Sequence, residues 1–173
     1  MDNKKRMMFV LDEDYYFIMI KVLIILNQLE CYKKKFIDYR KLAFIIAFIK
    51  EDRDLDLYKR SIKGYDELNI LERERLVNIF YRGKMDQPVI KRELFFLEKK
   101  KLISLEKNVK FNCIDVVLIK NKDLNKILSS DKFNNDIEKV NKIYKELNRV
   151  TSIKYDTFIE RVFGNSEVSR WGC

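Results

Sequence analysis

The sequence contains no histidine, and its four glycines, Gly64, Gly83, Gly164 and Gly172, are isolated from one another. Without histidine, neither a Ser-His nor a Cys-His catalytic pair can form, and the commonest general base is missing. Isolated glycines do not build the glycine-rich loops that cradle the phosphates of nucleotides. We therefore expect a protein that is not an enzyme and that uses no cofactor.

Cysteine is scarce too, since Cys31, Cys113 and Cys173 are far apart and none belongs to a Cys-x-x-Cys pair. Zinc sites and disulfide frameworks need several such ligands, so this pattern indicates reduced thiols and no metal site. A membrane-spanning helix needs about 20 apolar residues, whereas the longest apolar run, residues 15–26, is shorter and contains Lys21. We expect a soluble, cytoplasmic protein.

A single proline and few glycines also argue against a β-sandwich or β-barrel, because such folds need many tight turns. What the chain has instead is apolar residues: 47% of its 173 residues are hydrophobic and 13% are aromatic, enough for one globular core. Residues 42–49 include no polar side chain, which is typical of a buried helix. The expected fold class is mainly α with a small β-hairpin (α+β).

The spacing of apolar residues predicts a first helix over residues 14–30 and a second helix with Asp38 as its N-cap. Residues 51–64 are charged and aperiodic, so we expect a loop whose acidic side chains are solvated. A third helix is expected to stop at Gly83, and a fourth to begin at Pro88.

Near-alternation and β-branched residues between Ile103 and Cys113 predict a β-hairpin with its turn at Lys107 and Asn108. Helices followed by a hairpin in this order are typical of a winged helix, and apolar spacing predicts further helices beyond it. The expected organisation is a charged lead-in (1–13), a winged-helix-like domain (14–117), a C-terminal helical arm (118–163) and a flexible tail (164–173).

The formal net charge of +9 suits contact with nucleic acid or an anionic membrane surface. Lysine also accumulates without a ligand in proteins from AT-rich genomes, so charge alone leaves both interpretations open. Base reading uses Arg, Asn or Gln on an exposed helix face, and only Gln87 and Arg92 qualify here, so we expect contact with the DNA backbone. The candidate DNA-contacting residues are Lys91, Arg92, Lys99, Lys100, Lys101, Lys107 and Lys110.

Two nearly apolar helices, over residues 15–26 and 42–49, need more cover than the other predicted elements supply. Surplus apolar surface on a soluble protein marks an interface with another chain. The candidate interface residues are Tyr15, Ile18, Met19, Val22, Phe44, Phe48, Ile137, Ile143 and Tyr144.

Two segments carry a resemblance to a known family. Asp38 and Tyr39, with Leu42, open the near-apolar helix as Asp-Tyr-x-x-Leu, and residues 91–103 read K-R-x-L-x-x-L-x-x-x-x-L-I before the hairpin. In order and pattern, residues 14–163 resemble the small middle component of ABC three-component systems, a group that includes Lamassu-type bacterial antiviral defence loci.

The resemblance implies a non-catalytic subunit that docks on an SMC-like ABC ATPase together with an effector, often a nuclease. Such a complex senses foreign DNA from phage or plasmid. Two alternatives stay open on the residues alone: a free-standing winged-helix transcription regulator, and a structural adaptor that does not contact DNA.

Overall fold

The computed structural model describes the backbone of residues 3–164 and the side chains of residues 15–164. In this part of the chain the structure is mostly helical with one two-stranded antiparallel sheet, which confirms the α+β class. The elements are α1 (Asn3–Gln28), α2 (Arg40–Lys50), α3 (Asp52–Lys63), α4 (Ile70–Lys99), β1 (Ile103–Asn108), β2 (Cys113–Leu118), α5 (Lys122–Leu128), α6 (Asn134–Glu146) and α7 (Tyr155–Phe163).

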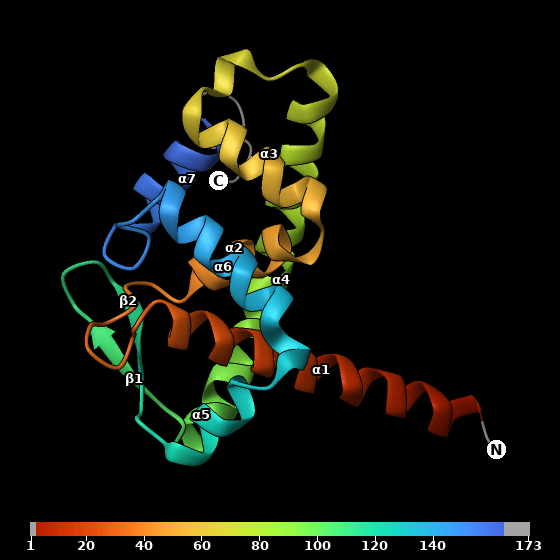
Figure 1. Cartoon of the computed structure of the whole chain (residues 1–173), viewed down its shortest axis with the longest axis vertical. Coiled ribbons are helices and arrows are strands. Elements are labelled where there is room, and N and C mark those ends of the chain that lie inside the picture. The colour runs from red at the N-terminus through yellow and green to blue at the C-terminus, as the bar shows by residue number, and fades with distance from the viewer. Residues whose placement is uncertain (1–2, 165–173) are drawn as a thin grey trace.

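Helix α2 lies at the centre of the fold, as its apolar sequence predicts. Eight of its eleven residues are buried, and it packs against α1, α3, α4, α6 and α7. Its Phe44 ring lies among the rings of Phe80, Phe158 and Phe163, with centroids 5.4 to 6.1 Å apart. The core is therefore built around one short helix near the centre of the molecule (Figure 1).

The segment 51–64, expected to be a loop, is the helix α3. Its apolar residues are few but share one face, so that Leu55 and Tyr58 are buried. Its acidic residues are paired: Asp54 binds Arg75, and Asp52 lies 3.0 Å from the ammonium of Lys139. The segment has so few apolar residues that their helical spacing did not predict this amphipathic helix from the sequence.

The predicted third and fourth helices are one continuous helix, α4, which runs through Gly83 and Pro88. At Gly83 the helix packs so closely on α2 that a Cβ atom would lie 2.4 Å from the ring of Phe44. Here glycine permits close helix packing and does not end the helix. No helix-turn-helix divides residues 70–99, so the winged-helix arrangement is not confirmed.

The β-hairpin is confirmed, but its turn lies farther along than predicted. Strand pairing runs from Ile103 opposite Leu118 to Asn108 opposite Cys113, so the connection is residues 109–112. Asn108 stays in the strand because its amide donates to Asp115 at 2.8 Å. The residue that takes positive φ is Asn112, at 48°.

The C-terminal helices belong to the same core as the rest of the chain. Val140 and Ile143 of α6 and Phe158 and Val162 of α7 are fully buried against the N-terminal helices. Residues 118–163 are therefore no separate arm. The expected tail lies outside the described residues from 165 onward.

Helix α1 begins at Asn3, within the expected lead-in, and its N-terminal end projects from the body of the molecule (Figure 1). Where α1 crosses the body it packs on α4 and α6, and Val22 is fully buried. Among the described residues, no helix combines the length and apolar character needed to cross a bilayer.

Most of the residues expected to form the partner interface are buried inside the protein. The chain's own core contains Met19, Val22, Phe44, Phe48 and Ile143, each at most 8% exposed, so none of them offers a surface to another chain. The sequence argument underestimated the available cover, because α3 was not expected to be a helix and α4 was expected to be broken. Ile18, Ile137 and Tyr144 are half-buried against the core, as Tyr15 is against α4.

Candidate nucleic-acid interface

An open groove of about 530 Å³ lies between α4, the β-hairpin and the start of α2. Its lining includes the cations Arg40, Lys91 and Lys107 and the aromatic residues Tyr39 and Phe95. The other lining residues are Glu98, Leu105, Asn112, Cys113 and Ile114. We call this feature the basic groove. In nucleic-acid-binding proteins, cations contact phosphate groups and exposed aromatic rings stack on bases.

The two segments that carry the family resemblance meet in this groove. Asp38 and Tyr39 lead into α2, and Lys91 begins the K-R-x-L run on α4, yet Tyr39 and Lys91 line the same hollow. Tyr39 also donates its backbone N–H to the carbonyl of Ile114 on β2 at 3.0 Å. The start of α2 is thereby anchored to the hairpin.

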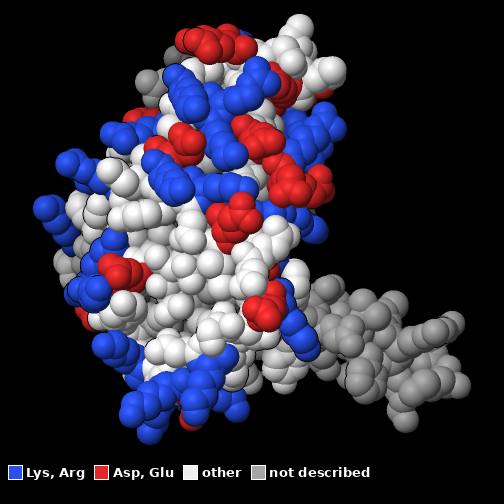
Figure 2. Space-filling view, viewed as in Figure 1, with Lys and Arg blue, Asp and Glu red and all other residues white. Residues whose placement is uncertain are grey.

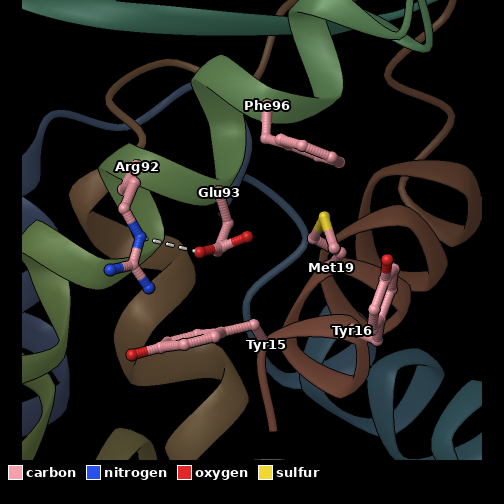
Figure 3. Close-up of a pocket in the computed structure, with 6 residues that line it drawn as sticks. All are labelled: Tyr15, Tyr16, Met19, Arg92, Glu93 and Phe96. Atoms are coloured by element: carbon pink, nitrogen blue, oxygen red, sulfur yellow. Dashed lines mark hydrogen bonds and ion pairs between the residues drawn. The ribbon is translucent and has the colours of Figure 1, made fainter. Parts of the chain in front are cut away.

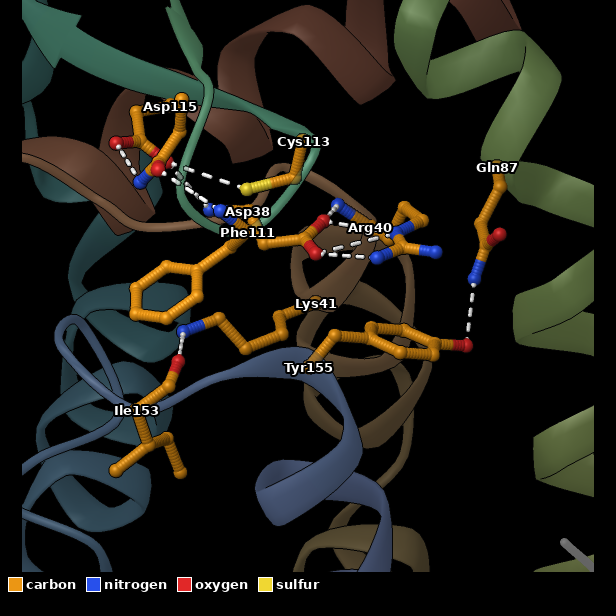
Figure 4. Close-up of polar contacts among 10 residues, drawn as sticks. Asp38, Arg40, Lys41, Gln87, Phe111, Cys113, Asp115, Ile153 and Tyr155 are labelled. Atoms are coloured by element: carbon orange, nitrogen blue, oxygen red, sulfur yellow. Dashed lines mark hydrogen bonds and ion pairs between the residues drawn. The ribbon is translucent and has the colours of Figure 1, made fainter.

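Arg40 is held in a fixed position at the groove (Figure 4). Its Nε donates to both carboxylate oxygens of Asp38 at 2.9 and 3.2 Å, and its Nη2 donates to one of them at 2.5 Å. The guanidinium stacks on the ring of Tyr155, 4.2 Å from the centroid. The hydrogen bonds that Arg40 donates to the Asp38 carboxylate raise the pKa of Arg40, so it stays charged.

Asp38 is itself constrained. It is 2% exposed and has a φ of 62°, a conformation that L residues other than Asn and Asp rarely adopt. Its backbone N–H donates to the Asp115 carboxylate at 3.1 Å, and its own carboxylate accepts the Arg40 N–H at 3.1 Å. The N-cap of α2 is Tyr39 and not Asp38 as expected, although the Asp38 carboxylate still accepts the N–H of the first helical residue. These hydrogen bonds hold the left-handed backbone of Asp38 in the geometry from which its carboxylate orients Arg40.

Lys41 connects α2 to the segment that precedes α7. Its side chain is fully buried, and Nζ donates to the carbonyls of Val150 at 2.6 Å and Ile153 at 2.7 Å (Figure 4). Burial lowers the pKa of Lys41 to about 7. Tyr155, two residues beyond Ile153, accepts a hydrogen bond from Gln87 of α4 at 3.1 Å. These contacts fix the ring on which Arg40 stacks.

The structure divides the seven predicted DNA-contacting residues among several places. Lys91 and Lys107 line the basic groove. Lys110 lies in the hairpin connection, 5.3 Å from the ring of Phe111. Arg92 lies elsewhere, because it pairs with Glu93 at 3.0 Å and stacks on the ring of Tyr15 at 4.1 Å.

The remaining three predicted residues are at the C-terminal end of α4. Lys101 has a φ of 58° and donates its backbone N–H to the carbonyl of Glu98 at 2.8 Å, while Leu102 donates to Leu97 at 3.1 Å. This is a Schellman motif with lysine where glycine is usual.

Exposed lysines gather around this helix end, and none pairs with a carboxylate of the residues that the structure describes. Figure 2 shows Lys and Arg side chains gathered at the lower end of the molecule, where Figure 1 places α5. The exposed residues are Lys99, Lys100, Lys101, Lys120, Lys122 and Lys126.

A second pocket, of about 250 Å³, lies between α1 and α4 (Figure 3). Tyr15, Tyr16 and Met19 of α1 face Arg92, Glu93 and Phe96 of α4. Tyr16 is 61% exposed and Phe17, the next residue, is 54% exposed. Large apolar side chains therefore remain uncovered where α1 leaves the body.

Sequence reasoning missed Arg40, Tyr39 and Phe95 as site residues. A signal was present: Lys84, Gln87, Lys91 and Phe95 are spaced by three or four residues, which places them on one face of a single helix. The break predicted between Gly83 and Pro88 obscured that face.

Among the described residues, no three Cys, Asp or Glu side chains gather in a way that would hold a metal ion. Comparison of the chain with protein-family models, with curated proteins and with solved structures gives no match.

Proposed function

We propose that this protein is a non-catalytic accessory subunit that contacts the backbone of nucleic acid through the basic groove. The observation that carries the proposal is the guanidinium of Arg40, fixed by Asp38 and Tyr155 and accompanied in one groove by Lys91 and Lys107. Asp38 occupies Nε and Nη2, and Nη1 donates to no described residue. That edge of the guanidinium is available to a phosphate oxygen.

The charge balance of the groove supports an anionic ligand. The lining of the groove includes one carboxylate, that of Glu98. This carboxylate is engaged by the hairpin, since its Oε1 accepts the backbone N–H of Leu105 at 2.9 Å. Neither Lys91 nor Lys107 pairs with a carboxylate of the described residues. Two unpaired ammonium groups and a fixed guanidinium are suited to consecutive phosphates.

Reversing the two lysine charges tests this function. We expect Lys91→Glu with Lys107→Glu to weaken binding of a fluorescent oligonucleotide at least tenfold. The slope of log affinity against log salt should fall by about 1.5, because two phosphate contacts are lost. The control, Lys63→Glu with Lys145→Glu, makes the same charge change at exposed sites on α3 and α6. Equal losses in both variants would show a general charge effect and remove the groove from the proposal.

The proposal includes a partner that binds α1. Tyr16 and Phe17 are exposed where this helix projects from the body, and such apolar surface is typical of an interface. The resemblance to middle components suggests the partner class: an SMC-like ABC ATPase with its effector, in defence against phage or plasmid DNA. The transcription-regulator alternative is less well supported, because α4 has no helix-turn-helix.

Co-expression with a coiled-coil ABC ATPase encoded by a neighbouring gene tests the proposed partner. We expect Tyr16→Glu with Phe17→Glu to abolish co-purification, and Ile127→Glu, at an exposed position on α5, to preserve it. If both variants co-purify as the wild type does, the partner does not bind this part of α1.

A further inference from the structure

We infer that the basic groove binds single-stranded nucleic acid, with one base stacked on Phe95 while Arg40, Lys91 and Lys107 contact phosphates. This inference rests on the proposed function and specifies its ligand. It concerns a chemistry shared by single-stranded DNA and RNA, namely an anionic backbone with bases that can turn outward.

The shape of the groove favours a single strand over a duplex. Proteins read a duplex by inserting a protruding helix or β-ribbon into its major groove. Here Arg40, Lys91 and Lys107 line a hollow of about 530 Å³ between three elements. A duplex keeps its bases stacked inside and brings only its backbone to such a hollow, whereas a single strand can place a base within it.

Phe95 is placed to receive that base. It is 44% exposed although it lies on a helix that buries Leu94 and Leu97 at neighbouring positions. Phe95 follows Lys91 by one helical turn, so the ring and the ammonium share one face of α4. Leu105 and Ile114 of the hairpin add apolar lining to the same groove. A base on the Phe95 ring would thus have a cation beside its phosphate and an apolar wall beside its edge.

Cations continue along α4 beyond the groove. The Lys84 ammonium lies 5.3 Å from the centroid of the Tyr155 ring, and Arg40 stacks on that same ring. Lys84 and Lys91 are seven residues apart, which is about 11 Å along a helix. In duplex DNA the phosphates of one strand follow one another about every 3.4 Å along the axis, and a strand with a base turned outward is more extended. The face of α4 is therefore long enough to contact at least two phosphates of one strand.

A pair of adjacent phenylalanines gives a sharp test. Phe95→Leu removes the aromatic face and keeps an apolar side chain. Phe96→Leu is the matched control, because Phe96 is 42% exposed but lies in the pocket with Tyr15. The probes are oligo-dT and oligo-U of about 12 nucleotides, an abasic strand of equal length and charge, and a duplex of the same length.

We expect Phe95→Leu to weaken binding of oligo-dT or oligo-U by about 5- to 100-fold, in line with the loss of one stacked base. Binding of the abasic strand should be the same in both variants and the wild type, and Phe96→Leu should bind every probe as the wild type does. Tighter binding of oligo-dT would identify the ligand as single-stranded DNA, and tighter binding of oligo-U would identify it as single-stranded RNA; both results support the inference.

Four results would overturn the inference. If Phe95→Leu binds oligo-dT and oligo-U as tightly as the wild type does, no base stacks on Phe95. If the wild type binds the abasic strand as tightly as oligo-dT, no base is stacked; if it binds the duplex more tightly than either single strand, the groove is not selective for single strands. In these three cases contact with the backbone, and so the proposed function, survives. If the wild type binds none of the four probes, the proposed function fails together with the inference.

Discussion

Replacing Lys41 with methionine should change how the stability of the protein depends on pH. The ammonium side chain is fully buried, and burial lowers its pKa from 10.5 to about 7. In the unfolded chain the same amine regains an ordinary pKa. Between these two values the unfolded chain binds more protons than the folded protein, so stability must rise with pH.

The magnitude follows from the two pKa values. At about pH 8, folded Lys41 is roughly one-tenth protonated and the unfolded amine is almost fully protonated, which gives a slope of about 1.2 kcal/mol per pH unit. From about pH 7 to 8.5 the integrated gain is about 1.6 kcal/mol. This contribution is complete above the unfolded pKa and is lost as pH falls through about 7.

The pH range from about 7 to 8.5 suits this measurement, because the sequence contains no histidine whose titration would add to the pH dependence of stability. Two thiols act in the opposite direction at higher pH: burial raises the pKa of Cys31 to about 12 and that of Cys113 to about 11. Both thiols remain in Lys41→Met, so their effect cancels when the variant is compared with the wild type.

The assay is urea unfolding, followed by circular dichroism, at several pH values between about 7 and 8.5. The Lys41→Met curve of stability against pH should be flatter than the wild-type curve by about 1.6 kcal/mol over that range. The absolute stability will also change, since the Val150 and Ile153 carbonyls lose their donor. Lys145→Met, at an exposed site on α6, is expected to follow the wild type. Parallel curves for wild type and Lys41→Met would refute the lowered pKa.

Three further predictions concern single positions. Gly83→Ala should destabilise the protein by about 1–3 kcal/mol in urea unfolding, because its Cβ would overlap the Phe44 ring; equal or greater stability would contradict close packing of α4 on α2. Asp38→Ala should lower stability by about 2–3 kcal/mol and weaken oligonucleotide binding, because Arg40 loses its support; unchanged binding would show that Arg40 needs no positioning. Lys101→Gly should raise the free energy of unfolding by about 0.5–1 kcal/mol, since glycine adopts positive φ without strain; a loss of stability would argue against the helix end described above.

The elements that the sequence predicted well are those whose signal is local. Helix α2 follows from an unbroken apolar run, and the hairpin follows from alternation between Ile103 and Cys113. The errors arose where tertiary packing outweighs local preference. Gly83 and Pro88 are breakers by propensity, yet burial of Phe80 and Ile90 on either side keeps α4 continuous.

The candidate site was predictable only in part, for a similar reason. Lys91 and Lys107 were identified because positive charge is visible in the sequence. The position of Arg40 depends on Asp38, on Tyr155 more than one hundred residues away, and on the left-handed backbone of Asp38, and no local pattern reports such contacts. Five of the nine expected interface residues are buried in the core, because burial depends on how many helices cover a surface, and α3 was missing from that estimate.

The polar network behind the groove is itself an argument for function. Asp38 and Asp115 are at most 4% exposed and Lys41 is fully buried, so three ionisable groups lie in the core close to one another. Apolar residues of similar size would often stabilise such a core equally well. The network instead joins the hairpin and the segment before α7 to the start of α2, and its outermost members are Arg40 and Tyr155. A costly interior arrangement that ends in one immobilised guanidinium supports the proposal that this guanidinium binds a ligand.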